Sequence, residues 1–440
     1  MTTILWLRRD LRVHDHPALD AARIGTDHLV PVFCFDDRLL HGRHASGPRT
    51  QFLLECLADL DRSLRARGSR LVIRHGRPEA EIAKLAAETK ADAVHYTGDV
   101  GAFARDRDRR VEQALGIPVH EHPGLFAAEN LEAIRTTDGN PYTTFTPFHR
   151  AWSGSPRRRP SGAPRALPPL PPGLAHGAIP ELGDLGLHQE VEEPMRGGET
   201  VGRERLRRFV SDRAAAYEYA RDLLAEDGAS RLSPYLHFGC LSAREVEARV
   251  PSHEFRRQLG WRDFFAHVLL HFPGNAQSEH QARYRGTINW SRAEKAFEAW
   301  CEGRTGYPLV DAGMRQLRHE GWMHNRARLV VASFLTKDLG IDWRWGERWF
   351  MRLLLDGDEA SNNGNWQWVA SVGVDPRPPF RRLFNPARQQ ERFDPDGAYV
   401  RRYVPELRNG GAHRYPPPIV DHQVARQEAL ARYRVAASSG

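Results

Sequence analysis

The chain begins with TILWLR (residues 3–8), a short apolar run rich in β-branched and bulky side chains. Four similar runs follow before residue 128: LVPVFCF (29–35), RLVIRH (70–75), DAVHYT (92–97) and IPVHEH (117–122). Between them, residues 49–67, 78–88 and 102–115 have the helical spacing of apolar positions. Strands that alternate with helices predict a parallel sheet covered on both faces. No GxGxxG follows the first strand, so a dinucleotide-binding Rossmann assignment has no support.

The character of the sequence changes twice after this part. The segment SPRRRPSGAPRALPPLPPG (155–173) is rich in Pro and Gly, which disfavour strands and regular helices. Residues 129–198 are therefore expected to form a long connector over the surface. From residue 199 onward strand signals vanish and helical periodicity takes over. We expect an α/β domain at 1–128, the connector at 129–198 and an all-α domain at 199–440.

Composition limits the class of protein. The 440 residues are 40% hydrophobic, carry a net charge of +7 and contain no run close to the ~20 apolar residues of a membrane span. The four cysteines form no CxxC pair, which favours a soluble protein of the reducing cytoplasm. Arg outnumbers Lys, which suits phosphate recognition, but a charge of +7 on this length leaves nucleic-acid binding open.

Tryptophan is concentrated late in the chain, with nine of the eleven after residue 260. Core packing explains any single one of them. The pairs 343/345 and 366/368 are spaced i, i+2, so on a helix their members point about 200° apart and cannot fill one pocket. A row of Trp can pass an electron and a surface Trp can stack on a base, and the spacing alone leaves both uses open.

One predicted helix carries a mixed polar and aromatic face. Gln258, Trp261, Arg262 and Phe265 are spaced i, i+3, i+4 and i+7 and therefore share one side. This combination suits a flat polar ligand, and an interface between domains is the plainer interpretation.

A second predicted helix, after GWMH at 321–324, contains Arg328 followed by an apolar run. An Arg buried in such a helix needs an anionic partner, and Asp356 and Asp358 are the candidates.

Seven motifs, in order and spread over nearly the whole chain, resemble the cryptochrome/photolyase family, most closely DNA photolyases of the class I cyclobutane pyrimidine dimer type. They are WLRRDLRVHDHPAL (6–19), SRLSPYLHFG (230–239), QLGWRDFF (258–265), TGYPLVDAGMRQL (305–317), GWMHNRAR (321–328), DGDEASNNGNWQW (356–368) and FNPARQQERFDPDGAYVRRYVPEL (384–407).

This resemblance implies a fold and an activity. Family members have an α/β N-terminal domain, a connector and a helical C-terminal domain that holds FAD. The resemblance implies an enzyme, a deoxyribodipyrimidine photo-lyase, in which light drives an electron from reduced FAD to a flipped-out dimer in UV-damaged DNA. A monomer with no membrane attachment is expected.

Residue by residue, the resemblance implies sites for cofactor and DNA. Expected FAD-binding positions are Tyr217, Ser230, Arg231, Leu232, Ser233, Arg262, Asn325, Arg328, Asp356, Gly357, Asp358 and Asn362, with Asn362 facing flavin N5. Expected electron carriers are Trp366, Trp343 and Trp290, running outward in that order. Expected DNA or lesion contacts are Arg221, Gln258, Trp261, Arg262, Asn325, Arg326, Leu329, Trp368 and Arg382, where Trp261 and Trp368 sandwich the dimer and Arg382 lies near a backbone phosphate.

Departures from the family pattern bear on the substrate. Gln258 occupies the place where dimer photolyases commonly have Glu, and enzymes for the 6-4 photoproduct also have Gln there. Those enzymes need two His at the positions of Asn325 and Leu329, so the cyclobutane dimer stays the expected substrate. A 6-4 photolyase and a cryptochrome-type photoreceptor without repair remain alternatives. Ala229 stands where the family usually has Thr, which puts one phosphate contact in doubt.

An antenna chromophore is also expected from the resemblance. Gly101 and Ala102 replace the Asn-Glu pair of folate-binding members, and TGDVGAFARDRD looks more like members that bind 8-hydroxy-5-deazaflavin. Asp99 and Phe33 are candidate contacts near the carboxyl ends of the strands. No metal site is expected, because His267 and His271 lack the Glu of an HExxH motif and suit helix packing.

Overall fold

The computed structural model describes residues 1–226, 228–408, 413 and 415–439, which form two compact units. Unit 1 comprises Met1–Gln189, Arg196–Ala215 and Ser230–His271, and unit 2 comprises Glu190–Met195, Ala216–Ala229 and Phe272–Gly440. The three-part division at residues 128 and 198 stays a prediction. Within the described part of the chain, no helix is long and apolar enough to cross a bilayer.

Unit 1 contains a parallel five-stranded sheet. Its strands are β1 (Thr2–Leu7), β2 (His28–Phe35), β3 (Val72–His75), β4 (Ala93–Thr97) and β5 (Val119–His122), and their spatial order is β3-β2-β1-β4-β5. All four strand pairings are parallel. Each strand coincides with one of the five apolar runs, so the predicted α/β architecture is confirmed.

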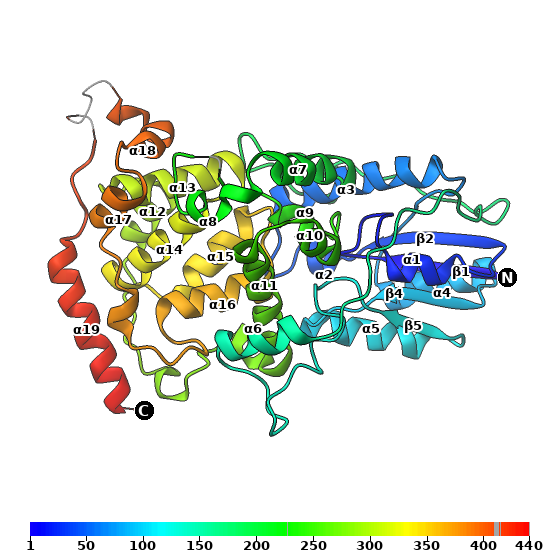
Figure 1. Ribbon diagram of the computed structural model, residues 1–440, viewed down its shortest axis with the longest axis horizontal. Coiled ribbons are helices and arrows are strands. Elements are labelled where there is room, and N and C mark those ends of the chain that lie inside the picture. Colours follow the sequence, from blue (N-terminus) through cyan, green and yellow to red (C-terminus); the bar gives the residue numbers. More distant parts are fainter. Residues whose placement is uncertain (227, 409–412, 414, 440) are drawn as a thin grey trace. The chain divides into compact units, whose positions relative to one another are not determined.

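Both faces of the sheet are covered. Ile4 and Trp6 point into a core with α4 (Pro78–Thr89) and α5 (Ala102–Ala114), whereas Leu5 and Leu7 point to the opposite face and are also buried. The short helix α1 (Pro17–Ala22) contacts β1, β4 and β5 (Figure 1). Strands β1 and β2 are buried on both faces, which explains why their runs are apolar and do not alternate.

The rest of unit 1 consists of helices and irregular segments. Its other helices are α2 (Asp37–Leu40), α3 (Gly47–Arg65), α6 (Phe145–Gly154), α7 (Glu199–Asp212), α9 (Ser233–His237), α10 (Ala243–Arg249) and α11 (His253–His271). The helix α6 lies inside the expected connector, whereas residues 129–144 before it and the Pro-rich part after it form no α-helix or strand. Phe145, Phe148 and Trp152 form its buried face.

Unit 2 contains no strand among its described residues (Figure 1). Its helices are α8 (Tyr217–Ala220), α12 (Glu294–Glu302), α13 (Pro308–Glu320), α14 (Asn325–Ser333), α15 (Trp343–Leu353), α16 (Glu359–Ala370), α17 (Pro386–Phe393), α18 (Ala398–Tyr403) and α19 (His422–Ser439). A π-helical turn, Phe334–Asp338, continues α14. The predicted all-α C-terminal part is therefore confirmed.

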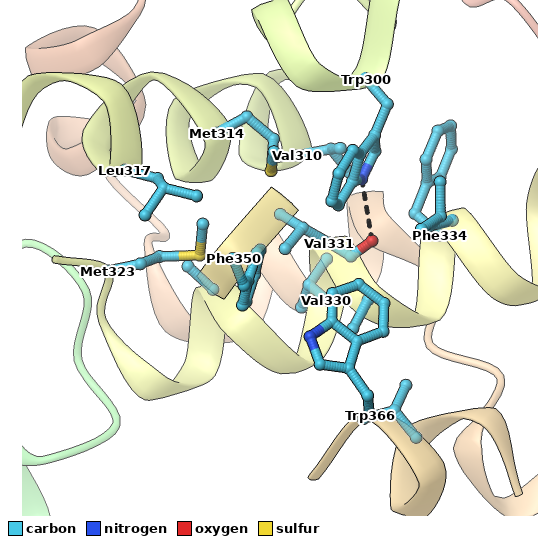
Figure 2. Close-up of a cluster of buried hydrophobic side chains, with 14 of the residues drawn as sticks. Trp300, Val310, Met314, Leu317, Met323, Val330, Val331, Phe334, Phe350 and Trp366 are labelled. Atoms are coloured by element: carbon cyan, nitrogen blue, oxygen red, sulfur yellow. Dashed lines mark hydrogen bonds between the residues drawn. The ribbon is translucent and has the colours of Figure 1, made fainter. Parts of the chain in front are cut away.

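One hydrophobic core holds unit 2 together. Figure 2 shows side chains of α12, α13, α14, α15 and α16 packed around Val330 and Val331, with Trp300 on one side and Trp366 on the other. The indole Nε1 of Trp300 donates to the carbonyl oxygen of Val331 at 3.0 Å, so this buried polar group is satisfied. The same core supports the α14 and α16 side chains discussed below.

All four cysteines, Cys34, Cys56, Cys240 and Cys301, are buried and free. Burial raises the pKa of the Cys34 and Cys301 thiols to about 12. Burial also raises the pKa of Cys56, which hydrogen-bonds Cys240. The thiols of Cys34, Cys56 and Cys301 therefore stay protonated and unreactive at neutral pH.

Candidate functional site

An ion pair joins α14 to the segment before α16. Arg328 Nη2 lies 2.9 and 3.1 Å from the two carboxylate oxygens of Asp356, and its Nε donates to the carbonyl oxygen of Met323 at 2.8 Å. Asp356 is almost fully buried, whereas Arg328 is partly exposed. The predicted pairing of Arg328 with a carboxylate of this motif is confirmed, with Asp356 as the partner.

The second acidic residue of the motif caps a helix. Asp358 is the N-cap of α16, and its side chain accepts from the Ser361 backbone N–H at 2.8 Å. Gly357 stands between the two acids, of which Asp356 pairs with Arg328 and Asp358 caps the helix. Asn362, in the first turn, donates its amide Nδ2 to the Glu347 carbonyl of α15 at 2.9 Å. The amide oxygen is then the group that Asn362 can offer to a ligand.

These side chains line a pocket of unit 2. Its polar wall includes Arg328, Asp356 and Asn362, and its apolar wall includes Phe350 and Trp366. The complete lining consists of Asn325, Arg328, Leu329, Ala332, Phe350, Leu354, Asp356, Ser361, Asn362, Asn365, Trp366 and Val369. An apolar wall faced by a few convergent polar groups suits a flat ring with a polar edge.

The two tryptophans of α16 face different surroundings. Trp366 is buried in the core, where its ring lies 5.0 Å from Phe350 and 6.2 Å from Trp300 (Figure 2). Trp368 is half-buried. The predicted divergence of this i, i+2 pair is thus present. Gly346 of α15 allows the close packing, because a Cβ there would overlap the Trp366 ring.

The other two expected electron carriers are also in unit 2. Trp343, the first residue of α15, is fully buried, and Trp290 is half-buried with its ring 6.3 Å from Tyr433. Trp300, which contacts Trp366, was not singled out from the sequence, because its position shares no motif or spacing with Trp366.

Arg382 does not adopt the arrangement expected of a phosphate contact. Its side chain is 1% exposed, Nη1 donates to the Trp368 carbonyl oxygen at 2.7 Å, and Nη2 pairs with Asp375 at 2.5 Å. The guanidinium carbon lies 4.1 Å from the centre of the Trp368 ring. A buried, paired guanidinium cannot reach a DNA phosphate in this conformation.

In unit 1, the mixed face of α11 has partners of its own. Gln258 donates through Nε2 to Glu254 at 2.9 Å, one helical turn earlier. Trp261 stacks on Phe145 of α6, with ring centres 3.6 Å apart and planes within 6°. Glu254 was missed from the sequence, although its i−4 spacing from Gln258 could have indicated it.

Arg262 is anchored by backbone oxygens of unit 1. It donates to the carbonyl oxygens of Leu125 at 3.0 Å and Leu236 at 3.3 Å. Its guanidinium also lies 5.1 Å from the Phe126 ring centre. The contact between Arg262 and the flavin that the resemblance implies stays a prediction.

The remaining candidates divide between the units. Unit 1 holds Ser230, Arg231, Leu232 and Ser233 at the entry to α9, and Arg231 has a left-handed backbone at φ 53°. Such a conformation in a non-glycine residue costs energy and is enriched at functional sites.

Unit 2 holds Tyr217 and Arg221 at α8 and Arg326 on α14. Arg326 pairs with Asp222 at 2.9 Å.

A second pocket lies in unit 1, beyond the carboxyl ends of β4 and β5. Asp99 lines it, as expected for an antenna contact, together with residues 121–126, residues 128–132 and parts of α5. Phe33 is buried within β2 against Phe35, at 5.0 Å between ring centres, and is not among the lining residues. The expected contact at Phe33 is therefore not supported.

Both expected helix-packing histidines have partners within unit 1. His267 Nε2 accepts from the Tyr142 N–H at 3.1 Å, and Nδ1 lies 3.2 Å from the Leu131 carbonyl oxygen. The ring of His271 packs on that of His267 at 4.5 Å.

Comparison with known proteins places this architecture in a family. Residues 3–171 match the DNA photolyase family model, and residues 255–414 match the model of the FAD binding domain of DNA photolyase. The chain belongs to the photolyase/cryptochrome family.

Similar proteins carry photolyase and cryptochrome names. The chain is 37% identical to a deoxyribodipyrimidine photo-lyase of a Synechococcus species, over 98% of this chain and 96% of that one. It is 39% identical to a cryptochrome DASH of Gloeobacter violaceus, over 92% and 86% of the two chains. A crystal structure of a bacterial class III photolyase from Agrobacterium tumefaciens superposes with a TM-score of 0.90 at 36% identity, covering 99% and 98%. The expected class I subtype stays a prediction.

The pocket of unit 2 fits part of the flavin that this domain family binds. Arg328 supplies a cation, Asn362 an amide and the apolar wall a flat surface, which suit an aromatic ring whose reduced form is anionic. Asp356 keeps the cation in place. FAD is thus the cofactor that the family and the donor set support.

Proposed function

We propose that this protein repairs cyclobutane pyrimidine dimers in UV-damaged DNA, as a cytoplasmic monomer with FAD. When bound, reduced FAD supplies the light-driven electron that opens the cyclobutane ring. The chain's own task is to hold the ring, to exclude water and to present the lesion. Leu329, Ala332 and Val369 exclude water from the pocket wall.

The charges around the pocket support this proposal. Arg328 offers a cation whose position is fixed by Asp356, and such a cation stabilises an anionic ring. Asn362 is immobilised by Glu347, so its amide oxygen can accept from a protonated ring nitrogen without reorganising. Trp366 lies in the same wall and can pass an electron inward.

The residues that line the unit 2 pocket are the observation that favours the cyclobutane dimer as the lesion. Asn325 and Leu329 line it, and its described lining residues include no His. Repair of a 6-4 photoproduct in this family depends on imidazole proton donors at those two positions. The cyclobutane dimer, whose splitting needs no such donor, is therefore the favoured substrate.

Light-dependent repair of defined substrates tests the proposal. Purified protein with reduced flavin should restore an oligonucleotide that contains a cyclobutane dimer under blue light, and should leave a 6-4 photoproduct unchanged. Darkness and heat-denatured protein are the controls. Full flavin occupancy without dimer repair would refute the proposal, and repair of the 6-4 lesion alone would move the assignment to that class.

A cryptochrome-type photoreceptor is the second candidate. Gln258 in place of a carboxylate favours it, because the amide contributes no charge to the lesion pocket. Binding separates the two functions: a repair enzyme prefers dimer-containing DNA, whereas a sensor should bind damaged and undamaged DNA equally. Glu254, bonded to Gln258, keeps a carboxylate within one helical turn and supports the repair enzyme.

We also propose that 8-hydroxy-5-deazaflavin, in preference to a folate, occupies the unit 1 pocket lined by Asp99. The carboxyl ends of parallel strands are the usual ligand position in such sheets, which supports this site. A second absorption band besides those of flavin in purified protein would support an antenna, and its extraction and mass would identify the compound.

A further inference from the structure

The guanidinium of Arg382 lies against the ring of Trp368. Arg382 Cζ lies 4.1 Å from the ring centre of Trp368, and Arg382 Nη1 also bonds the Trp368 backbone oxygen at 2.7 Å. A guanidinium that bonds the backbone and covers the ring of the same residue restricts rotation of that side chain. The ring is half-buried, so part of its surface remains exposed to solvent.

The guanidinium of Arg382 has an acidic partner, and the backbone around it is fixed by hydrogen bonds. Asp375 pairs with Nη2 at 2.5 Å, and the carbonyl oxygen of Arg382 accepts from Ser333 Oγ at 3.0 Å. Ser333 Oγ in turn accepts from the Phe384 N–H at 3.2 Å, which fixes the chain on both sides of Arg382. Burial lowers the pKa of Arg382 to about 10, so the side chain remains a cation at neutral pH.

We infer that Arg382 is a positioning residue that sets the orientation of Trp368 and thereby the preference for a lesion over undamaged DNA. The inference rests on the proposed function, in which Trp368 stacks on the extruded dimer. It assigns no phosphate contact to Arg382. Its contribution is therefore specific to the flipped lesion, whereas a phosphate contact contributes equally to every DNA sequence.

Two binding measurements separate these roles. Dissociation constants of Arg382→Gln for one oligonucleotide, with and without a cyclobutane dimer, are measured by fluorescence anisotropy over a series of salt concentrations. We expect the affinity for the dimer to fall about tenfold, because a disordered ring loses most of one base stack. Affinity for undamaged DNA and the dependence on salt should not change.

Two more variants show whether a loss of dimer preference comes from the position of the ring, from the loss of the charge or from misfolding. Arg382→Lys keeps the charge, but an ammonium cannot bond Asp375 and the Trp368 oxygen while lying flat on the ring, so it should also lose dimer preference. Asp375→Asn frees the guanidinium and should reduce the preference in the same direction. The matched control is Arg352→Gln, because Arg352 lies 5.5 Å over Trp349 and pairs with Glu190, outside every candidate site. It should leave both affinities unchanged.

The possible results have distinct meanings. If damaged and undamaged DNA lose affinity in parallel, the salt slope falls by about one and Arg382→Lys restores binding, then Arg382 contacts phosphate and the inference is wrong. If wild type prefers the dimer and Arg382→Gln and Asp375→Asn prefer it equally, the inference is also wrong. If wild type itself shows no preference, the proposed function fails instead.

Discussion

Trp261 is supported from one side by a ring of the chain itself, because Phe145 stacks on it at 3.6 Å. The proposed function uses its remaining surface for one base of the dimer. Trp261→Ala should therefore weaken binding of dimer-containing DNA by roughly 1–3 kcal/mol, the usual contribution of one base stack. Titration with a dimer-containing oligonucleotide measures this change.

Trp345→Ala is the control for that prediction, since Trp345 is also half-buried and contacts a Phe ring at 5.1 Å but has no assigned role. Equal losses in the two variants would show that Trp261 contributes only packing.

At the scale of single residues, some side-chain contacts could be predicted from the sequence and others could not. The Arg328 pair with an acid of the 356–358 motif was predictable, because a buried Arg demands a carboxylate and the motif offers two. Burial of Arg382 was not predictable. It depends on Asp375 and on the carbonyl oxygen of Trp368, and no spacing rule links these groups.

At the scale of helices, α15 and α16 pack closely at Gly346. A Cβ at this position would overlap the Trp366 ring. Gly346→Ala should therefore destabilise the protein by about 1–3 kcal/mol, the usual cost of overpacking a core. Urea unfolding followed by circular dichroism measures the loss.

Gly154→Ala provides the matched control, because a Cβ added to this helical glycine meets no atom within 4 Å. It should be neutral or slightly stabilising. A neutral Gly346→Ala would mean that the helices separate at little cost.

The stability of the protein should depend on pH through His267 of helix α11. Its Nε2 accepts from Tyr142 N–H, so protonation would set two donors against each other. Burial lowers the pKa of His267 from its ordinary 6.5 to about 4. Between these values the unfolded chain binds more protons than the native one, so stability falls as pH falls through this window. By pH 5 this one group costs about 2 kcal/mol.

The variant His267→Gln isolates this contribution, since a Gln amide can donate and accept without titrating. The difference in unfolding free energy between the variant and wild type should shift by that amount in favour of the variant from pH 7 to pH 5. An unchanged difference would assign the acid sensitivity to other groups.

The strands and the long helices were more predictable from the sequence than short or irregular helical segments. The five strands follow from apolar runs, and α3, α4 and α5 follow from periodicity, because burial imposes both patterns. Helix α6 was not expected, since it lies beside a Pro-rich segment. Nothing in FLTKD (334–338) indicates a π-helical turn, in which Lys337 donates to the Ala370 carbonyl oxygen at the end of α16 at 2.9 Å.

At the scale of the molecule, electrons need a route from the buried pocket to solvent. Trp366 and Trp343 are buried and Trp290 is half-buried, which suits the outward order implied by the family. Trp290→Phe should slow photoreduction of oxidised flavin and leave repair by chemically reduced protein nearly intact. Absorption during illumination and a dimer assay measure the two effects.

Trp349→Phe is the comparison, because Trp349 is also half-buried and belongs to no expected path. If repair by reduced protein collapses in Trp290→Phe, then Trp290 is structural.

The burial of all four thiols has a practical consequence for labelling. With each native sulfur enclosed, maleimide reagents would find no competing target in the folded protein. A cysteine placed on an exposed residue of each unit would then accept a donor and an acceptor dye, and their energy transfer would follow the distance between the units as DNA binds.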